Sequence, residues 1–149
     1  FGTWTFTDPD FFKLGKGLIR DRLNMQFPGG LPSDGTPGMK LMEDLWKRYK
    51  TVEKFDAAYW EGVVVGMIME RAFVRAHEAS KEINREAINR ALESFRQEDF
   101  GGLLPAVTYT STDHGASYRA RIVKVAEDGS YKPLTNFYTP GKEKIKFLK

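Results

Sequence analysis

The chain ends in two short β-forming runs that limit what it can fold into. Tyr118 to Ala126 and Tyr131 to Tyr138 are rich in β-branched and aromatic residues, and Glu127-Asp-Gly-Ser130 separates them. Gly129 can adopt the positive φ that a tight turn needs, so the pattern predicts a hairpin. Because an isolated two-stranded hairpin is not stable in water, this one must dock on a larger body.

Upstream of the hairpin, strand and helix signals alternate. Residues 1–6 and 21–27 have strand composition. Between them, Asp8 precedes Pro9, which has a suitable φ for a first helical residue and no amide hydrogen to leave unpaired. The sequence therefore predicts a helix over residues 9–16.

Three further helices are expected in the middle of the chain. Thr36-Pro37 repeats the cap-plus-proline signal at the start of the first. The second, Phe55 to about His77, has apolar residues almost all round, which predicts a largely buried helix. The third is capped by Asn84, carries one apolar stripe, and is expected to stop at Phe100-Gly-Gly102.

This order of elements predicts an α/β architecture with a partly parallel sheet. The number of strands is small for such a sheet, because only two precede about 70 residues of helical sequence. We therefore expect the other strands of the sheet to lie outside this chain.

Composition excludes several classes of function. The sequence has no cysteine, which excludes disulfides and thiolate metal sites. The net charge of +3 comes from interspersed residues except at the tail, residues 142–149, which we interpret as a solvated end rather than a nucleic-acid site. The glycines at 15, 17, 29 and 30 are not followed by the Lys-Ser or Lys-Thr of phosphate-binding loops. No metal or other cofactor is predicted.

One pair of residues raises the possibility of catalysis. Asp113-His114 could form the base of a hydrolase, with Ser111 or Ser117 as the nucleophile. Adjacent residues of an extended segment point to opposite sides, so Asp113 is poorly placed to hold the ring of His114. We expect this pair to serve a turn, and the prediction is that the protein is not an enzyme.

Several segments together resemble a known family. Phe55-Asp-Ala-Ala-Tyr-Trp-Glu-Gly62 looks like its helix start, and Phe1-Gly-Thr-Trp-Thr5 like a strand followed by a cleft loop. Asp113-His114, followed by Arg121-Ile-Val-Lys-Val125 and Asp-Gly, is similar to its C-terminal end. The family is that of the type I periplasmic solute-binding proteins of ABC transporters, in the branched-chain amino-acid (Leu-Ile-Val-binding) subgroup. The chain resembles its C-terminal portion.

The resemblance implies a portion of a two-lobe fold. Each lobe would be a doubly wound, three-layer αβα unit, and three hinge crossings would join the lobes. Residues 1–27 would end the sheet of the second lobe. Residues 28–107 would supply mainly helices of the first lobe, with crossings near 26–38 and 105–112. Residues 108–149 would return to the second lobe as the terminal hairpin.

The resemblance also implies a function. It is that of an extracytoplasmic receptor, periplasmic or anchored outside the membrane of a bacterium, which binds a small solute by lobe closure and delivers it to an ABC permease. The expected partners are that permease, the solute, and either the missing N-terminal part of the protein or another copy. The first alternative is a ligand-sensing regulatory domain of the same fold, for an amide or an amino acid. The third candidate function, after the receptor and the sensor, is a hydrolase that would use His114.

The resemblance places five residues at the ligand. Trp4 matches the position of an acidic residue that pairs with the ligand ammonium group in amino-acid binders. Indole cannot form that ion pair and offers a flat face instead, so a hydrophobic or aromatic carboxylate becomes as plausible as a small amino acid. Thr3 and Thr5 would donate hydrogen bonds to a carboxylate. Phe55 and Tyr59 would contact the ligand side chain, whereas packing is the favoured role of Trp60, and core or strand roles remain open for the five.

Overall fold

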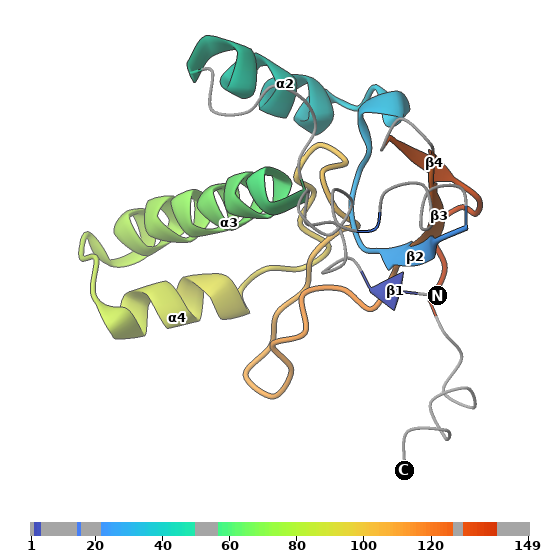
Figure 1. Cartoon of the computed structure of the whole chain (residues 1–149). Coiled ribbons are helices and arrows are strands. Elements are labelled where there is room, and N and C mark those ends of the chain that lie inside the picture. Colours follow the sequence, from blue (N-terminus) through green and yellow to red (C-terminus); the bar gives the residue numbers. More distant parts are fainter. Residues whose placement is uncertain (1, 4–14, 16–21, 50–56, 127–129, 140–149) are drawn as a thin grey trace.

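The computed structural model describes residues 2–3, 15, 22–49, 57–126 and 130–139 (Figure 1). The predicted helix over residues 9–16 lies outside the described residues, apart from Gly15, and the charged tail over 142–149 lies wholly outside them. Among the described helices, none has the length and apolar content needed to cross a bilayer.

The strands form one sheet from both ends of the chain. β1 (Gly2–Thr3) runs parallel to β2 (Asn24–Phe27), whereas β2 with β3 (Arg121–Val125) and β3 with β4 (Tyr131–Pro133) are antiparallel. The terminal hairpin is confirmed, and so is its docking, because β3 pairs with β2 along four residues from Asn24↔Lys124 to Phe27↔Arg121. The partly parallel sheet is also confirmed. The spatial order of the strands in the sheet is β1-β2-β3-β4.

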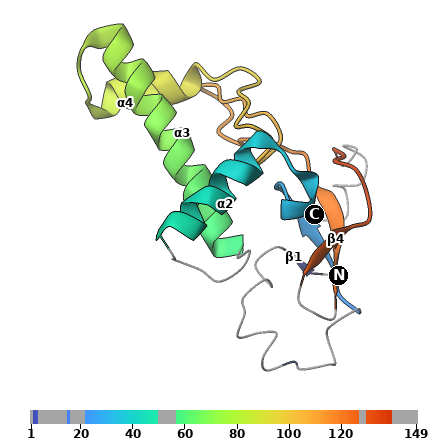
Figure 2. The ribbon, with the colours of Figure 1, turned by 90° about the horizontal axis from the view of Figure 1, so that it is seen from above.

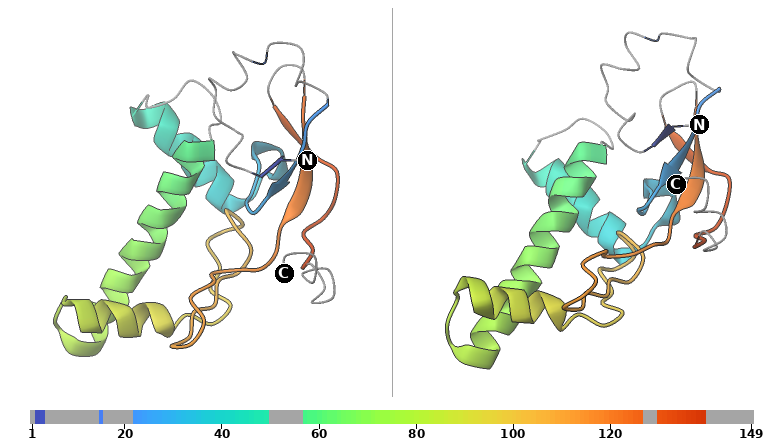
Figure 3. Two further views of the ribbon diagram at one scale, coloured as in Figure 1. Left: turned by 60° about the horizontal axis from the view of Figure 1, so that its bottom comes forward. Right: turned by 90° about the horizontal axis from the view of Figure 1, so that it is seen from below.

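The helices lie together on one side of the molecule, and the sheet lies on the other (Figures 2 and 3). A short 3-10 turn, η3 (Pro32–Asp34), leads into α2 (Pro37–Tyr49), and α3 (Ala57–Ser80) is followed by α4 (Arg85–Glu93). The predicted caps are present: Pro37 is the first residue of α2, and the Asn84 side chain accepts a hydrogen bond of 2.9 Å from the amide of Ala87.

The predicted end of the third helix is wrong. α4 stops at Glu93, and the chain between Ser94 and Val107 is a loop fastened by mutual backbone hydrogen bonds between Glu98 and Val107. The Ser94 hydroxyl donates to the carbonyl of Ala91, which ends the helix. Phe95 and Phe100 continue the apolar spacing in the sequence, but they are buried core residues of the loop.

The hydrophobic core joins the sheet to the helices. Met25 and Phe27 of β2 are fully buried, and so are Val123 and Val125 of β3. On the helix side, α3 packs on α4 through small residues, which let the two helices approach closely. These are Ala72, Ala76, Ala87 and Ala91.

One face of α3 remains uncovered by the described residues. Val65 is 52% exposed and Phe73 38%, although each is apolar. The prediction of a largely buried helix is therefore wrong for this chain by itself: α3 buries the face toward α4 and the core but exposes another. That exposure agrees with the expectation that other strands of the fold lie outside this chain.

Candidate functional site

The carboxyl ends of two parallel strands meet at one edge of the sheet. Thr3 is the last residue of β1 and pairs with Gln26 of β2. β2 ends one residue later at Phe27, and Pro28-Gly29-Gly30 leaves the sheet there. In α/β proteins, ligands bind beyond this edge of the strands.

The first turn of α3 packs on the same edge. The Trp60 ring lies 5.2 Å from the ring of Phe27, between centroids, and its Nε1 donates a hydrogen bond of 2.9 Å to the carbonyl of Leu103. Gly29 makes room for the indole, since a Cβ there would overlap the ring. Trp60 is 5% exposed, so its predicted packing role is confirmed.

The five predicted ligand residues are only partly described. Thr3 lies at the strand edge, where its backbone alone is described, and Tyr59 lies half-buried against the core beside Trp60. Trp4, Thr5 and Phe55 lie outside the described residues. Thr3 thus lies at the carboxyl end of β1, and Tyr59 precedes Trp60, whose ring packs on Phe27 of β2. The role of all five residues in ligand binding stays a prediction.

Two connecting segments run side by side between the helices and the sheet. The amide of Gly30 donates to the carbonyl of Leu103, and the amide of Gly38 donates to that of Gly101, both at 2.8 Å. A Cβ on Gly38 would lie 2.6 Å from the Phe100 carbonyl oxygen, so this approach requires glycine. Paired connections of this kind can absorb backbone rotation as a hinge. The predicted hinge crossings and segment boundaries themselves stay predictions.

A buried ion pair fastens the first connection to the sheet. Arg121 of β3 is 5% exposed, and its guanidinium binds the Asp34 carboxylate with both Nη atoms, one of them at 3.0 Å. Nη2 also donates to the carbonyl of Gly29 at 2.8 Å, and the group lies over the ring of Phe137, 4.7 Å from its centroid. This pair was not predicted from the sequence. The signal for it was an arginine in phase with the buried Val123 and Val125.

The charge of Asp34 is stabilised in the folded state. Partial burial raises the pKa of the carboxyl, but the hydrogen bonds from Arg121 and from the amide of Leu31 outweigh it. The net pKa therefore lies below the ordinary aspartate value.

A second ionic cluster holds the 94–107 loop on α3. The two oxygens of Glu98 accept hydrogen bonds from Arg71 at 2.8 Å and from Arg75 at 2.6 Å. The same guanidinium groups stack on Phe100 and Phe95, with centroid distances of 4.5 and 4.8 Å. The loop is therefore tied to the helix by charge and by ring contacts together.

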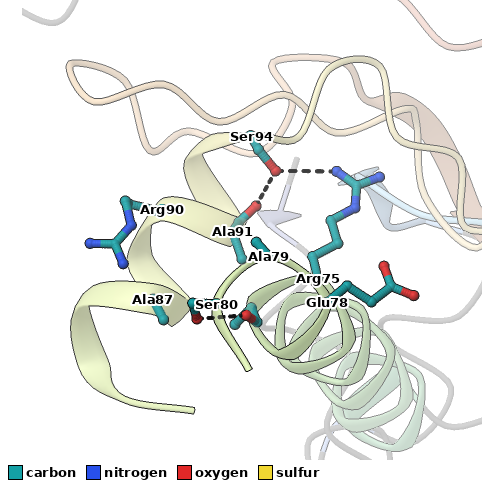
Figure 4. Close-up of a pocket in the computed structure, with 9 residues that line it drawn as sticks. Arg75, Glu78, Ala79, Ser80, Ala87, Arg90, Ala91 and Ser94 are labelled. Carbon is teal, nitrogen blue, oxygen red and sulfur yellow. Dashed lines mark hydrogen bonds between the residues drawn. The ribbon is translucent and has the colours of Figure 1, made fainter. Parts of the chain in front are cut away.

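Two pockets lie on the helix side, away from the strand edge. One, of about 600 Å³, lies between α3 and α4, where Ala76, Ala87 and Ala91 are among its lining and Arg75 reaches Ser94 across it (Figure 4). The other, of about 410 Å³, lies between the two helices and the segment carrying Tyr109. Tyr59, the predicted ligand residue whose side chain the structure describes, lines neither pocket.

The geometry at Asp113 and His114 does not form a catalytic pair. Asp113 Oδ1 accepts hydrogen bonds of 2.8 Å from the amide of Gly115 and from the hydroxyl of Tyr118. Both bonds lower the pKa of the Asp113 carboxyl, and the bond from Gly115 has the larger effect. His114 contacts Glu93 instead, with 3.2 Å between Nε2 and Oε1. Asp113 thus stabilises a turn, as expected. Its carboxylate is not positioned to orient His114, as the hydrolase alternative would require.

Comparisons with known proteins give a likeness of structure only. No protein-family model matches the chain, and no curated protein matches it in sequence. A branched chain amino acid ABC transporter from Thermus thermophilus, solved with bound valine, is 21% identical and superposes with a TM-score of 0.79 over 93% of this chain and 38% of that one. A fatty acid ABC transporter substrate-binding protein from Thermomonospora curvata is 23% identical, with a TM-score of 0.73 over 88% of this chain and 34% of that one.

A third match extends the same pattern. An ABC transporter substrate binding protein from Aeropyrum pernix is 19% identical, with a TM-score of 0.72 over 95% of this chain and 38% of that one. The chain thus spans well under half the length of each of these solved proteins. The resemblance inferred from the sequence is confirmed at the level of fold: the chain has the fold of a portion of a type I periplasmic binding protein.

Proposed function

We propose that this chain is the C-terminal part of an extracytoplasmic solute-binding receptor that serves an ABC importer. One observation carries the proposal: nearly the whole chain, 93%, superposes with a TM-score of 0.79 on part of a branched chain amino acid ABC transporter solved with bound valine. The other matches described above are substrate-binding proteins of ABC transporters as well. A location outside the cytoplasm and an ABC permease as partner are parts of the same proposal.

The ligand class that we propose is a small amino acid or a hydrophobic or aromatic carboxylate. Valine and fatty acids, named with two of the structural neighbours, share a carboxylate attached to an apolar chain. Thr3 and Thr5 would donate hydrogen bonds to such a carboxylate. Trp4, Phe55 and Tyr59 would contact the apolar part, since aromatic rings bury a large area at low cost in side-chain entropy.

The proposed mechanism is closure around the solute. Ligand contacts made from both lobes lower the free energy of the closed state, and the permease binds that state. The paired connections at Gly30–Leu103 and Gly38–Gly101 are suited to the hinge, because they are short, backbone-bonded and rich in glycine. No chemical step is required of the protein. The turn-forming role of Asp113 supports a binding protein rather than a hydrolase.

A thermal-shift panel on the full-length protein tests this proposal. The panel contains valine, phenylalanine, phenylacetate and octanoate, and the matching amides, which lack the carboxylate. A ligand at 100 times its Kd stabilises the folded state by about 2.7 kcal/mol, a readily measured rise in Tm. We expect one class of carboxylate to raise the Tm and its amide to have a smaller effect.

Variants connect the shift to the predicted site. Tyr59→Ala should reduce the ligand-induced rise, whereas Tyr49→Ala should preserve it, since Tyr49 is 63% exposed on α2. A panel without any shift, or a shift untouched by changes at all five predicted residues, would contradict the assignment.

A further inference from the structure

The carbonyl oxygen of Leu103 joins three segments of the chain. It accepts a hydrogen bond of 2.8 Å from the amide of Gly30, in the segment between β2 and α2, and one of 2.9 Å from Nε1 of Trp60, in the first turn of α3. Leu103 itself belongs to the 94–107 loop, and it is fully buried. A carbonyl oxygen has two lone pairs, so these two donors satisfy it. The oxygen therefore binds both connections to the end of α3 that points toward them (Figure 1).

The indole ring of Trp60 also packs against the sheet. It contacts Gly29, where a Cβ would lie 2.1 Å from its Cζ2 atom, and its centroid is 5.2 Å from that of Phe27 in β2. Phe27 in turn stacks on Tyr131 of β4, with 6.1 Å between centroids and an angle of 9° between the rings. Gly29 is held as well, since its carbonyl accepts a hydrogen bond of 2.8 Å from Arg121. A single side chain thus links α3, both connections and the sheet.

This side chain follows a proposed ligand residue directly. Tyr59 and Trp60 share the first turn of α3, and Tyr59 is half-buried. Adjacent side chains of a helix project about 100° apart, so the two rings have different neighbours although one turn of backbone carries both. A rotation of this turn that moves the ring of Tyr59 therefore also moves the indole of Trp60.

We propose that Trp60 is a positioning residue that couples the solute site to the connections between helices and sheet. This inference rests on the proposed function, since it assigns the path by which contact with a solute at Tyr59 reaches the hinge. A buried indole N–H needs an acceptor, but many carbonyl groups could meet that need. Here the acceptor is the Leu103 oxygen, which already joins the two connections. The bond therefore fixes the first turn of α3 to the hinge itself.

Trp60→Phe in the full-length protein tests this coupling without any solute. The change keeps an aromatic ring beside Phe27 but removes the donor, while the Leu103 carbonyl keeps its bond from Gly30, so no buried acceptor is left unpaired. The loss of one neutral hydrogen bond should speed amide hydrogen exchange at Gly30 by about two- to tenfold. The amide of Ile88, bonded within α4, is the internal reference and should not change.

Two more variants accompany this measurement. Gly29→Ala should also speed exchange at Gly30, although the indole is intact, because the new Cβ would displace the ring. Trp46→Phe is the matched control, since it makes the same substitution at a half-buried tryptophan of α2. Exchange at Gly30 should be unchanged in this control.

Solute binding gives the second readout. The probe is whichever of valine, phenylalanine, phenylacetate and octanoate raises the Tm of the wild type most. Calorimetric titration should give a Kd about two- to tenfold higher for Trp60→Phe than for wild type, because the turn that carries Tyr59 is held in place for a smaller fraction of the time. A role in packing alone would lower the Tm of the free protein and leave the Kd unchanged.

The expected result is faster exchange at Gly30 together with weaker binding in Trp60→Phe and Gly29→Ala, and neither effect in Trp46→Phe. Unchanged exchange at Gly30 in Trp60→Phe, or an unchanged Kd, would overturn the proposal and leave Trp60 as a packing residue. Neither of these results would contradict the proposed function, because the wild type would still bind its solute. A panel in which no solute stabilises the wild type contradicts the proposed function, and the coupling with it.

Discussion

Replacing Asp34 by alanine tests the buried ion pair that ties the first connection to the sheet. The change leaves the Arg121 guanidinium buried without its carboxylate. Removing one partner of a fully buried pair costs about 3 to 5 kcal/mol. Here the Asp34 side chain is 22% exposed, and Arg121 keeps the Gly29 carbonyl and the Phe137 ring, so we expect a cost below that range, about 2 to 3 kcal/mol.

Urea unfolding at pH 7 measures this loss, provided that the m-value is unchanged. Asp34→Ala combined with Arg121→Met should recover at least half of it, because the double variant has no unpaired charge. Lys47→Met is the control, since its partner Glu43 lies on the surface of α2, and no measurable change is expected. If the free energy of unfolding of Asp34→Ala alone lies within about 0.5 kcal/mol of the wild-type value, the reasoning is refuted, because ordinary surface substitutions have effects of that size.

The same pair predicts a dependence on pH. The folded-state pKa of Asp34 is lowered, so its contribution is fully present above the unfolded value of about 3.9 and is lost as the pH falls through the folded pKa. Wild type should therefore lose its advantage over Asp34→Ala below about pH 4. A stability difference that is constant from pH 7 to the acid limit would contradict this assignment.

Four further substitutions have distinct expected costs. Glu98→Ala should destabilise by about 1 to 3 kcal/mol in urea, because it removes the partner of two arginines and loosens the 94–107 loop. Gly38→Ala should cost about 1 to 3 kcal/mol, since its Cβ would meet a backbone carbonyl, and Gly35→Ala should cost about 1 to 2 kcal/mol for its φ of 61° alone, in open space. Asn84→Ala should cost about 0.5 to 2 kcal/mol by loss of the α4 cap. For each of these variants, a urea midpoint equal to that of wild type would refute the contact on which the prediction depends.

Features decided by local chemistry were predictable from the sequence. The hairpin follows from β-forming runs around a glycine turn, and the α4 cap follows from the Asn84 side chain. Both depend on residues close in sequence, so no tertiary information is needed. The shortage of strands likewise indicated that part of the fold lies outside this chain, and the exposed Val65 and Phe73 of α3 agree with that.

Features decided by tertiary contacts were not predictable in the same way. Phe95 and Phe100 fit helical spacing, yet they belong to a loop, where they stack under the guanidinium groups of Arg75 and Arg71. The partner of Arg121 is 87 residues away in sequence, so the in-phase arginine indicated a buried contact without naming it. The proposed ligand residues came from family resemblance, because threonine and aromatic side chains carry no chemistry that is specific to a binding site.

Small-angle X-ray scattering of the full-length protein tests the central claim most directly. The claim is that the connections between helices and sheet form a hinge that closes around a solute. We predict that the ligand identified in the thermal-shift panel lowers the radius of gyration, and that the effect saturates with the same concentration dependence as the rise in Tm. A saturating thermal shift with an unchanged radius of gyration would show that the protein binds its solute without closing, and would contradict the account.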